Sequence, residues 1–222
     1  MKPSEIRGML AMELRLDLRQ RHAFGGLLLY VIGAVYVCYL SVQKLVDVPM
    51  WNALFWVIQL FAAFNALSRS FQREEGGRQL YLYTLVDPRS VILARTLYNA
   101  LVMVLLTFLS LGFYTLFLGG EALGKAELGQ FVLVTLLGGV GFAAVLTLIS
   151  ALAARAGNGL GLMAILGFPV VLPMLLTLMR ASRNAIDGLP WAVNDKYVLW
   201  LLAIDALTVA LAWLLYPYLW RD

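Results

Sequence analysis

Cysteine and histidine are almost absent from this sequence. Its 222 residues include one cysteine, Cys38, and one histidine, His22. A disulfide framework or a CxxC motif needs a second cysteine, so neither can form within the chain. Zinc and haem sites built from several histidine and cysteine ligands of this chain alone are excluded for the same reason. A Ser–His–Asp or Cys–His catalytic set cannot be assembled either, because His22 lies outside the apolar spans.

Charge is also scarce. Charged residues make up 14% of the sequence, 62% of the residues are hydrophobic, and the mean hydropathy is +0.82. Soluble domains are about 45–50% apolar, so residues 1–222 are predicted to form a single membrane domain. The net charge of +4 could indicate a nucleic-acid partner, but Lys and Arg accumulate on the cytoplasmic segments of membrane proteins. We therefore predict membrane lipid, and no nucleic acid, as a partner.

Six apolar stretches approach the roughly 20 residues that a helix needs to cross a bilayer. They lie at 24–42, 51–67, 98–118, 131–154, 160–179 and 198–218. The first is too long for the apolar region of a cleaved signal peptide, and no small-residue cleavage site follows it. The fold class that we predict is an all-α membrane protein with six transmembrane helices.

Lys and Arg are distributed unevenly between the two sides that six spans define. The N-terminal segment, the second and fourth connections and the C-terminus together carry twelve, and the other side carries five. The side richer in these residues is normally the cytoplasmic one. Both termini are therefore predicted to be cytoplasmic, which agrees with an even number of spans.

The N-terminal segment is predicted to hold a helix that lies on the membrane surface, at residues 4–20. Apolar side chains recur every four residues along it: Ile6, Leu10, Leu14 and Leu18. Glu13 and Asp17 interrupt this apolar stripe. The alternative is that the segment extends the first span. We assign residues 1–23 to a cytoplasmic interfacial segment.

Two short stretches imitate catalytic motifs. Residues 119–125 read GGEALGK, but a phosphate-binding loop needs Ser or Thr next and a strand before it, and here Ala126 follows. Residues 74–78, EEGGR, approximate the EExxxR helix of intramembrane proteases, yet the arginine comes one residue early and the histidine motifs of those enzymes are missing. We therefore predict a non-catalytic chain that does not hydrolyse ATP by itself.

One carboxylate lies inside a predicted span. Asp205 is near the middle of the sixth span, where a charged residue costs about 2.5–3.5 kcal/mol. It is expected to face the protein interior, a water path or a partner chain, or to be protonated. A role in a substrate path or a subunit contact and a simple hydrogen bond to a neighbouring helix both remain open. The candidate hydrogen-bond partners are Gln59, Asn65 and Asn99.

The fifth span contains residues that favour bending. Each proline leaves a carbonyl unpaired in the preceding helical turn, and small residues let helices approach closely. A helix that bends during transport and a static packing helix both remain open. The hinge candidates are Gly157, Gly159, Gly161, Pro169 and Pro173.

The longest charged interruption of the apolar sequence is at residues 69–95. Asp87-Pro88 predicts a helix start, because proline suits the first helical turn and disfavours helix at the residue before it. Gly76-Gly77 predicts a second break. Residues 78–86, RQLYLYTLV, are long enough for about two helical turns between these breaks, and their leucines would otherwise be exposed for no reason. A cytoplasmic loop at 68–97 with a short helix is therefore predicted.

The chain resembles the permease subunit of the cytochrome c maturation ABC transporter, the haem exporter protein B (CcmB) family, over most of its length. The first cytoplasmic loop of that family follows a pattern like R-x-F-x-x-[DE]-x-x-[DG]-x-L-x-x-L-x-x-[SD]-P. The acidic and glycine positions align only approximately. The residues that carry the resemblance are Arg69, Phe71, Glu74 or Glu75, Gly76, Gly77, Leu80, Asp87 and Pro88. Residues 154–173 also resemble the Arg/Gly-rich turn and proline-bearing helix of the family.

The resemblance implies an ABC-2-like permease of the bacterial inner membrane that works with a CcmA-like ATPase and with a second copy of itself. ATP would bind the ATPase, this chain alone would hold no cofactor, and haem is a candidate substrate. A haem-handling CcmC-like protein and a CcmE-like haem chaperone are further implied partners. Haem export and release of the haem-loaded chaperone both remain open. The loop would be a coupling element that docks the ATPase through Arg69, Phe71, Arg73, Glu74, Glu75, Gly76, Gly77, Arg78, Leu80, Asp87 and Pro88.

Two other functions remain open from the sequence. The first is an ABC-2-type permease that exports a lipid, a polysaccharide or a drug. The second is a membrane assembly scaffold with no ATPase. Co-purification with a nucleotide-binding subunit separates the scaffold from the two permeases.

Overall fold

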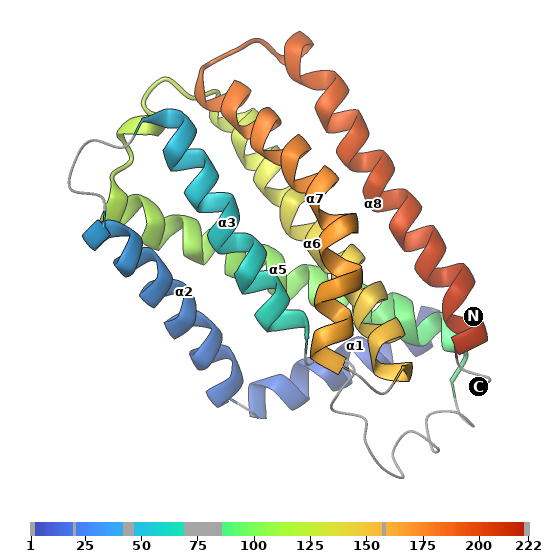
Figure 1. Cartoon of the computed structure of the whole chain (residues 1–222). Coiled ribbons are helices and arrows are strands. Elements are labelled where there is room, and N and C mark those ends of the chain that lie inside the picture. Colours follow the sequence, from blue (N-terminus) through green and yellow to red (C-terminus); the bar gives the residue numbers. More distant parts are fainter. Residues whose placement is uncertain (1–2, 20, 42–46, 69–85, 157–158, 220–222) are drawn as a thin grey trace.

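The regular structure of the protein is helical wherever it is described. The computed structural model describes residues 3–19, 21–41, 47–68, 86–156 and 159–219, and these ranges contain no strand. The helices are α1 (Pro3–Arg19), α2 (Arg21–Ser41), α3 (Val48–Leu67), α5 (Pro88–Leu118), α6 (Leu128–Arg155), α7 (Gly159–Ile186) and α8 (Trp191–Leu219), with a short 3₁₀ turn at Glu121–Leu123 (Figure 1). The predicted all-α class is confirmed.

Two helices begin with the same N-terminal cap, an aspartate followed by a proline in the first turn. Asp47 accepts a hydrogen bond from the backbone N–H of Met50 at the start of α3, over 3.2 Å. Asp87 accepts one from the N–H of Arg89 at the start of α5, over 2.9 Å. A side-chain cap satisfies an N–H that has no partner inside the helix, and proline loses nothing at that position. The helix start predicted at Pro88 is confirmed.

Five of the described helices are long and apolar enough to cross a membrane, namely α3, α5, α6, most of α7 (Gly161–Ile186) and α8. The stretch Gly25–Ser41 of α2 is also apolar but shorter than these five, at the lower limit of about 17 residues for a membrane span. Several helices extend past the apolar stretches seen in the sequence. For example, α5 begins at Pro88, ten residues before the predicted span, and residues 88–97 of the predicted loop are its first turns.

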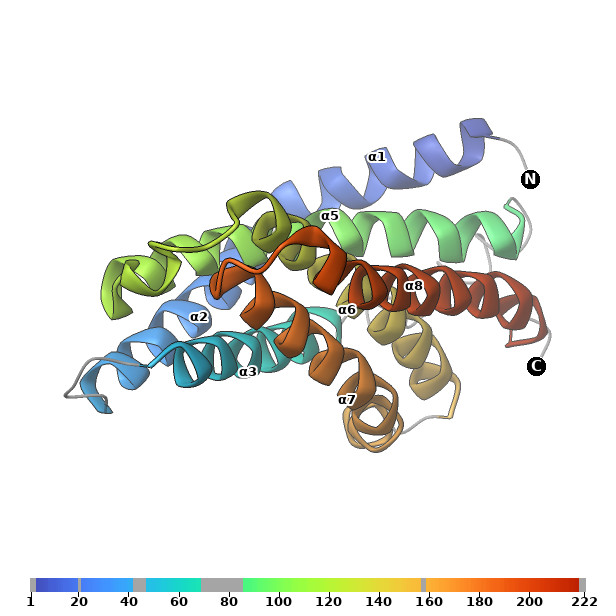
Figure 2. The same ribbon diagram turned by 90° about the horizontal axis from the view of Figure 1, so that it is seen from above.

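Helix α6 lies at the centre of the bundle and packs against α3, α5, α7 and α8 (Figure 2). In the most apolar 18-residue stretch of α6, 78% of the residues are buried, compared with 22% in the corresponding stretch of α8 and 28% in that of α5. Glycine makes this crowding geometrically feasible, because a Cβ at Gly138 would come within 2.5 Å of the Trp56 ring. The core therefore forms around α6, and the other helices face outward on one side.

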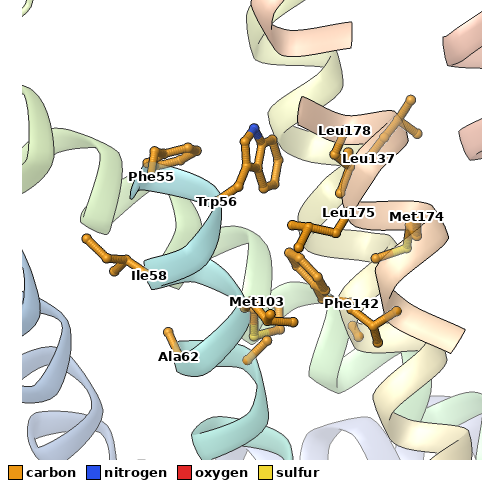
Figure 3. Close-up of a cluster of buried hydrophobic side chains, with 14 of the residues drawn as sticks. Phe55, Trp56, Ile58, Ala62, Met103, Leu137, Phe142, Met174, Leu175 and Leu178 are labelled. Atoms are coloured by element: carbon orange, nitrogen blue, oxygen red, sulfur yellow. The ribbon is translucent and has the colours of Figure 1, made fainter. Parts of the chain in front are cut away.

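Aromatic and methionine side chains fill the space between α3 and α6. Trp56 and Phe142 lie 6.2 Å apart between ring centroids, and Leu175 and Met174 approach them from α7 (Figure 3). Met103 closes the cluster from α5 and is fully buried. Truncating a buried Phe or Trp typically costs about 3–5 kcal/mol, so this cluster is expected to hold α3 against the central helix.

The N-terminal helix α1 is a separate element that packs on α5. The chain changes direction between α1 and α2, so α1 is not a straight extension of the first span (Figure 1). Its Met9 is buried in a cluster at the end of the bundle where α5 begins and α8 ends. We call this group the basal cluster, and it comprises Met9, Val91, Ile92, Ala94, Leu148, Ala151, Ala212 and Tyr216.

Candidate functional site

The first turns of α5 are held by polar contacts from α1. Ser90 donates a hydrogen bond to a Glu5 carboxylate oxygen over 3.0 Å. Five residues further along α5, Arg95 lies 3.6 Å from Glu13, measured from Nε to Oε1. The side chain of Arg95 is 4% exposed and that of Glu13 is 16% exposed, so both charges are largely removed from water. Removing one partner of an ion pair that is this buried strongly destabilises a protein, because the other charge stays buried without compensation.

The same turns of α5 also contact α8. The guanidinium of Arg89 lies 4.3 Å from the centroid of the Trp213 ring, a cation–π contact. Below it, Tyr216 is buried in the basal cluster together with Ile92. Both α1 and α8 contact the first turns of α5. A displacement of the N-terminus of α5 is therefore expected to move α1 and α8.

Most of the docking residues predicted from the sequence fall outside the described residues. The structure describes Asp87 and Pro88, which cap and open α5. The short helix predicted at 78–86 also lies outside the described residues, except for Val86. The remaining docking residues are outside them as well: Arg69, Phe71, Arg73, Glu74, Glu75, Gly76, Gly77, Arg78 and Leu80.

The intramembrane polar residues have separate partners. The Gln59 amide donates to Ser110 and to the Thr107 carbonyl. The Asn99 amide donates to the Thr147 hydroxyl over 2.8 Å, which links α5 to α6. Among the described residues, neither carboxylate oxygen of Asp205 has a hydrogen-bond partner, although its side chain is buried. The structure therefore does not bring Gln59, Asn65 or Asn99 into a hydrogen bond with Asp205.

Asn65 instead lines a cavity of about 360 Å³ that lies over α3 between α2 and α7. The cavity is mostly apolar, and one wall is the stacked pair of Phe64 and Phe168, whose centroids are 5.0 Å apart. The described residues that line it are Tyr30, Phe61, Phe64, Asn65, Ser68, Met163, Ala164 and Phe168.

The hinge candidates lie in or next to a continuous α7. Pro169 and Pro173 are inside the helix and exposed, whereas Gly157 lies outside the described residues. A Cβ at Gly161 would meet no atom within 4 Å, so this glycine is not required by packing. The close contact lies at Gly167, where a Cβ would come 2.9 Å from the Phe64 ring. Sequence reasoning missed this position, because a lone glycine in an apolar run gives no sign of its neighbour.

A hydrogen-bond network at the opposite end of the bundle was also not predicted. Ser182 accepts from the Trp56 indole over 2.8 Å and donates to the Asn52 side-chain oxygen over 2.7 Å, joining α3 to α7. Asn194 of α8 donates to Gln130 of α6 over 3.0 Å. These polar residues stand at helix ends in the sequence, where solvated side chains are the ordinary expectation. Their burial follows only from the tertiary packing.

The helices and their polar contacts define a multi-pass, all-α membrane protein, and the described residues contain no group of three or more His, Cys, Asp or Glu that could hold a metal ion. The sequence model of the CcmB protein family matches residues 5–218. The chain therefore belongs to the CcmB family, and the resemblance seen in the sequence is confirmed. No curated protein matches the sequence.

Membership in this family makes the chain a component of the ABC transporter system for haem export in cytochrome c maturation. Members of the family are membrane subunits of that system, and they generally work with the CcmA ATPase and with CcmC. Among the functions that the sequence left open, the family match favours the cytochrome c maturation transporter over an exporter of lipid, polysaccharide or drug and over a scaffold.

Proposed function

We propose that the chain crosses the bacterial inner membrane six times, with both termini in the cytoplasm. The start of α1 and the end of α8 lie together, since Ile6 and Leu219 both pack against the basal cluster. Termini on the same side require an even number of crossings. Helix α2, at 21 residues, supplies the sixth.

We further propose that residues 69–88 are the docking site of a separate ATPase and that ATP binds to that subunit. The observation that carries it is the continuity of α5, which runs for 31 residues from the capped Pro88 to Leu118. At a rise of about 1.5 Å per residue, such a helix is about 46 Å long, more than the hydrocarbon core of a bilayer. A displacement of the docking loop would thus be transmitted across the membrane, and to α1 through the Glu13–Arg95 pair.

The proposed cargo is haem or a haem-loaded chaperone, and the chain itself holds no cofactor. A second copy of the chain would complete the membrane domain, and CcmC-like and CcmE-like proteins would supply and accept haem. The family membership supports these assignments. In the proposal, movement of α5 relative to the central α6 is the step that ATP hydrolysis drives.

The docking assignment is tested by reversing charge at Glu74 and Glu75. We expect Glu74→Lys/Glu75→Lys to reduce the ATPase subunit that co-purifies with the permease by at least about tenfold, equivalent to about 1.4 kcal/mol of binding free energy. Membrane insertion should be unchanged, because the substitutions lie outside the apolar spans. The matched control is Glu121→Lys/Glu127→Lys, which reverses two charges in the connection between α5 and α6, on the opposite side.

The control variant should retain both the ATPase and the yield of c-type cytochromes. Wild-type co-purification and wild-type cytochrome yield in the Glu74/Glu75 variant would contradict the docking assignment. Equal losses in both variants would contradict it too, because the effect would then not be specific to the loop.

A further inference from the structure

Asp205 is enclosed by the chain itself. It lies in the middle of α8 and is 8% exposed. Its carboxylate faces Gly141 of α6 so closely that a Cβ at that glycine would come 2.6 Å from Oδ1. The same Cβ would lie 2.7 Å from the sulfur of Met174 on α7. Three helices of one chain thus close over the carboxyl group, and a side chain from a partner protein has no room to reach it.

This enclosure leaves the carboxyl group without polar contacts. Among the described residues, none forms a hydrogen bond with Oδ1 or Oδ2. The nearest hydroxyl along α8, that of Thr208, donates to the Ile204 carbonyl over 2.8 Å. Many other buried polar side chains of the bundle have partners, as the amide of Asn194 donates to the Gln130 oxygen and the Ala181 carbonyl. The neutral oxygens Gln59 Oε1 and Thr107 Oγ1 share with Asp205 the lack of a hydrogen bond among the described residues. Asp205 differs from them because it is the acidic side chain among the buried described residues, and both of its oxygens lack a hydrogen bond.

Charged groups on the helices that pack against α8 lie towards the two ends of the bundle. On α7 the nearest, Arg180, is six residues from Met174, or about 9 Å along the helix, and on α6 Arg155 is about 21 Å from Gly141. On α8 itself Lys196 is about 14 Å away. The titratable or charged groups on these elements are Asp195, Lys196, Tyr197, Tyr216 and Tyr218 of α8, Arg180 and Arg183 of α7, Glu127 and Arg155 at the ends of α6, and Arg89, Arg95, Tyr98 and Tyr114 of α5.

An ionised carboxylate at this position would be buried with neither a hydrogen bond nor a counter-ion from the described residues. Such burial of an unpaired charge is strongly unfavourable, whereas a protonated carboxyl group carries no charge. We propose that Asp205 is a proton-binding site and that the close packing of α8 against α6 and α7 is its protonated state. The proton comes from water and binds one carboxylate oxygen; its release to water leaves a charge that favours separation of α8 from Gly141 and Met174.

The proposal is tested with the purified full-length chain in lipid nanodiscs, and it does not depend on the docked ATPase. Infrared difference spectra should show the C=O stretch of a protonated carboxyl group near neutral pH. The band is expected to be lost in Asp205→Asn and retained in Asp195→Asn, a matched control at an exposed position of the same helix. Absence of the band in the wild-type chain, or its persistence in Asp205→Asn, would overturn the proposal.

Thermal unfolding provides a second readout. If the packed state holds a proton that the unfolded chain releases, the unfolding midpoint must fall as the pH rises. This fall should be smaller in Asp205→Asn than in the wild-type chain and Asp195→Asn, and identical pH dependence in all three would refute the proton site. If Asp205→Asn does not fold, Asp205→Glu serves as the second variant, because it keeps a carboxyl group but in a different position. The infrared band must then shift. An unchanged band in Asp205→Glu would contradict the assignment of the band to Asp205.

Discussion

At the scale of single residues, Glu13 shows how a polar side chain can be required where the sequence pattern would place an apolar one. It interrupts the apolar stripe of α1, and the structure explains why, because its carboxylate lies 3.6 Å from the buried Arg95. Long basic side chains are rarely buried unless they are paired. The pair thus fixes how α1 is oriented on α5 as well as stabilising the contact.

Removing the charge of Glu13 should weaken this contact. We expect Glu13→Gln to lower the free energy of unfolding by about 1–3 kcal/mol, because the buried Arg95 guanidinium loses its ion pair with Glu13. Thermal unfolding in nanodiscs measures the change. The double variant Glu13→Leu/Arg95→Met removes both charges and is expected to be more stable than Glu13→Gln. A single variant with wild-type stability would show that the pair does not hold α1.

Local signals in the sequence predicted the residues whose role is local. The Asp87-Pro88 helix start and the isolated position of Asp205 both follow from the residue and its immediate neighbours. Gly141 and Ser182 could not be predicted in the same way, because what makes them matter is a side chain more than thirty positions away, Asp205 for the glycine and Trp56 for the serine. A single sequence carries helix periodicity but not the register between helices.

At the scale of elements, α7 combines two prolines on its exposed side with a tight contact on its buried side. Pro169 and Pro173 are exposed, one turn apart, and Gly167 lies against Phe64. The missing N–H of Pro173 leaves the carbonyl of Pro169 without its helical hydrogen bond. The helix can therefore bend on its outer side without losing the packing on its inner side.

Replacing one proline tests whether this bend is used. Pro173→Ala restores a backbone donor in the helix interior, where proline costs about 3 kcal/mol relative to alanine. We expect a higher unfolding midpoint together with a lower yield of c-type cytochromes, since a stiffer α7 bends less. Pro190→Ala, in the exposed turn before α8, is the control and should change neither quantity. Full cytochrome yield in Pro173→Ala would favour a static packing helix.

At the scale of the whole molecule, the bundle has two chemically different ends. The basal cluster joins α1, α5, α6 and α8 at one end through apolar contacts, with ion pairing at its edge. At the other end, α3, α6, α7 and α8 are joined by hydrogen bonds between neutral side chains. Hydrogen bonds of fixed geometry favour a rigid end, and we expect the basal end to move more during transport.

The orientation of these ends can be measured, because the chain has only one cysteine to remove. In a Cys38→Ser background, Gly8→Cys and Gly120→Cys place a thiol at two exposed positions where a side chain meets no neighbour. A membrane-impermeant maleimide added outside intact spheroplasts should label position 120, and should label position 8 only after permeabilisation. Labelling of both positions from the same side would contradict six crossings with cytoplasmic termini.

The enclosure of α6 also bears on how the protein responds to its membrane. A helix surrounded by four others meets few lipid tails, so bilayer thickness and composition act directly on the outer helices and reach α6 only through them. Its backbone amides should accordingly be among the last to exchange with deuterium. In a thinner or thicker bilayer, the outer helices would change their tilt around a central helix whose own surroundings stay nearly constant.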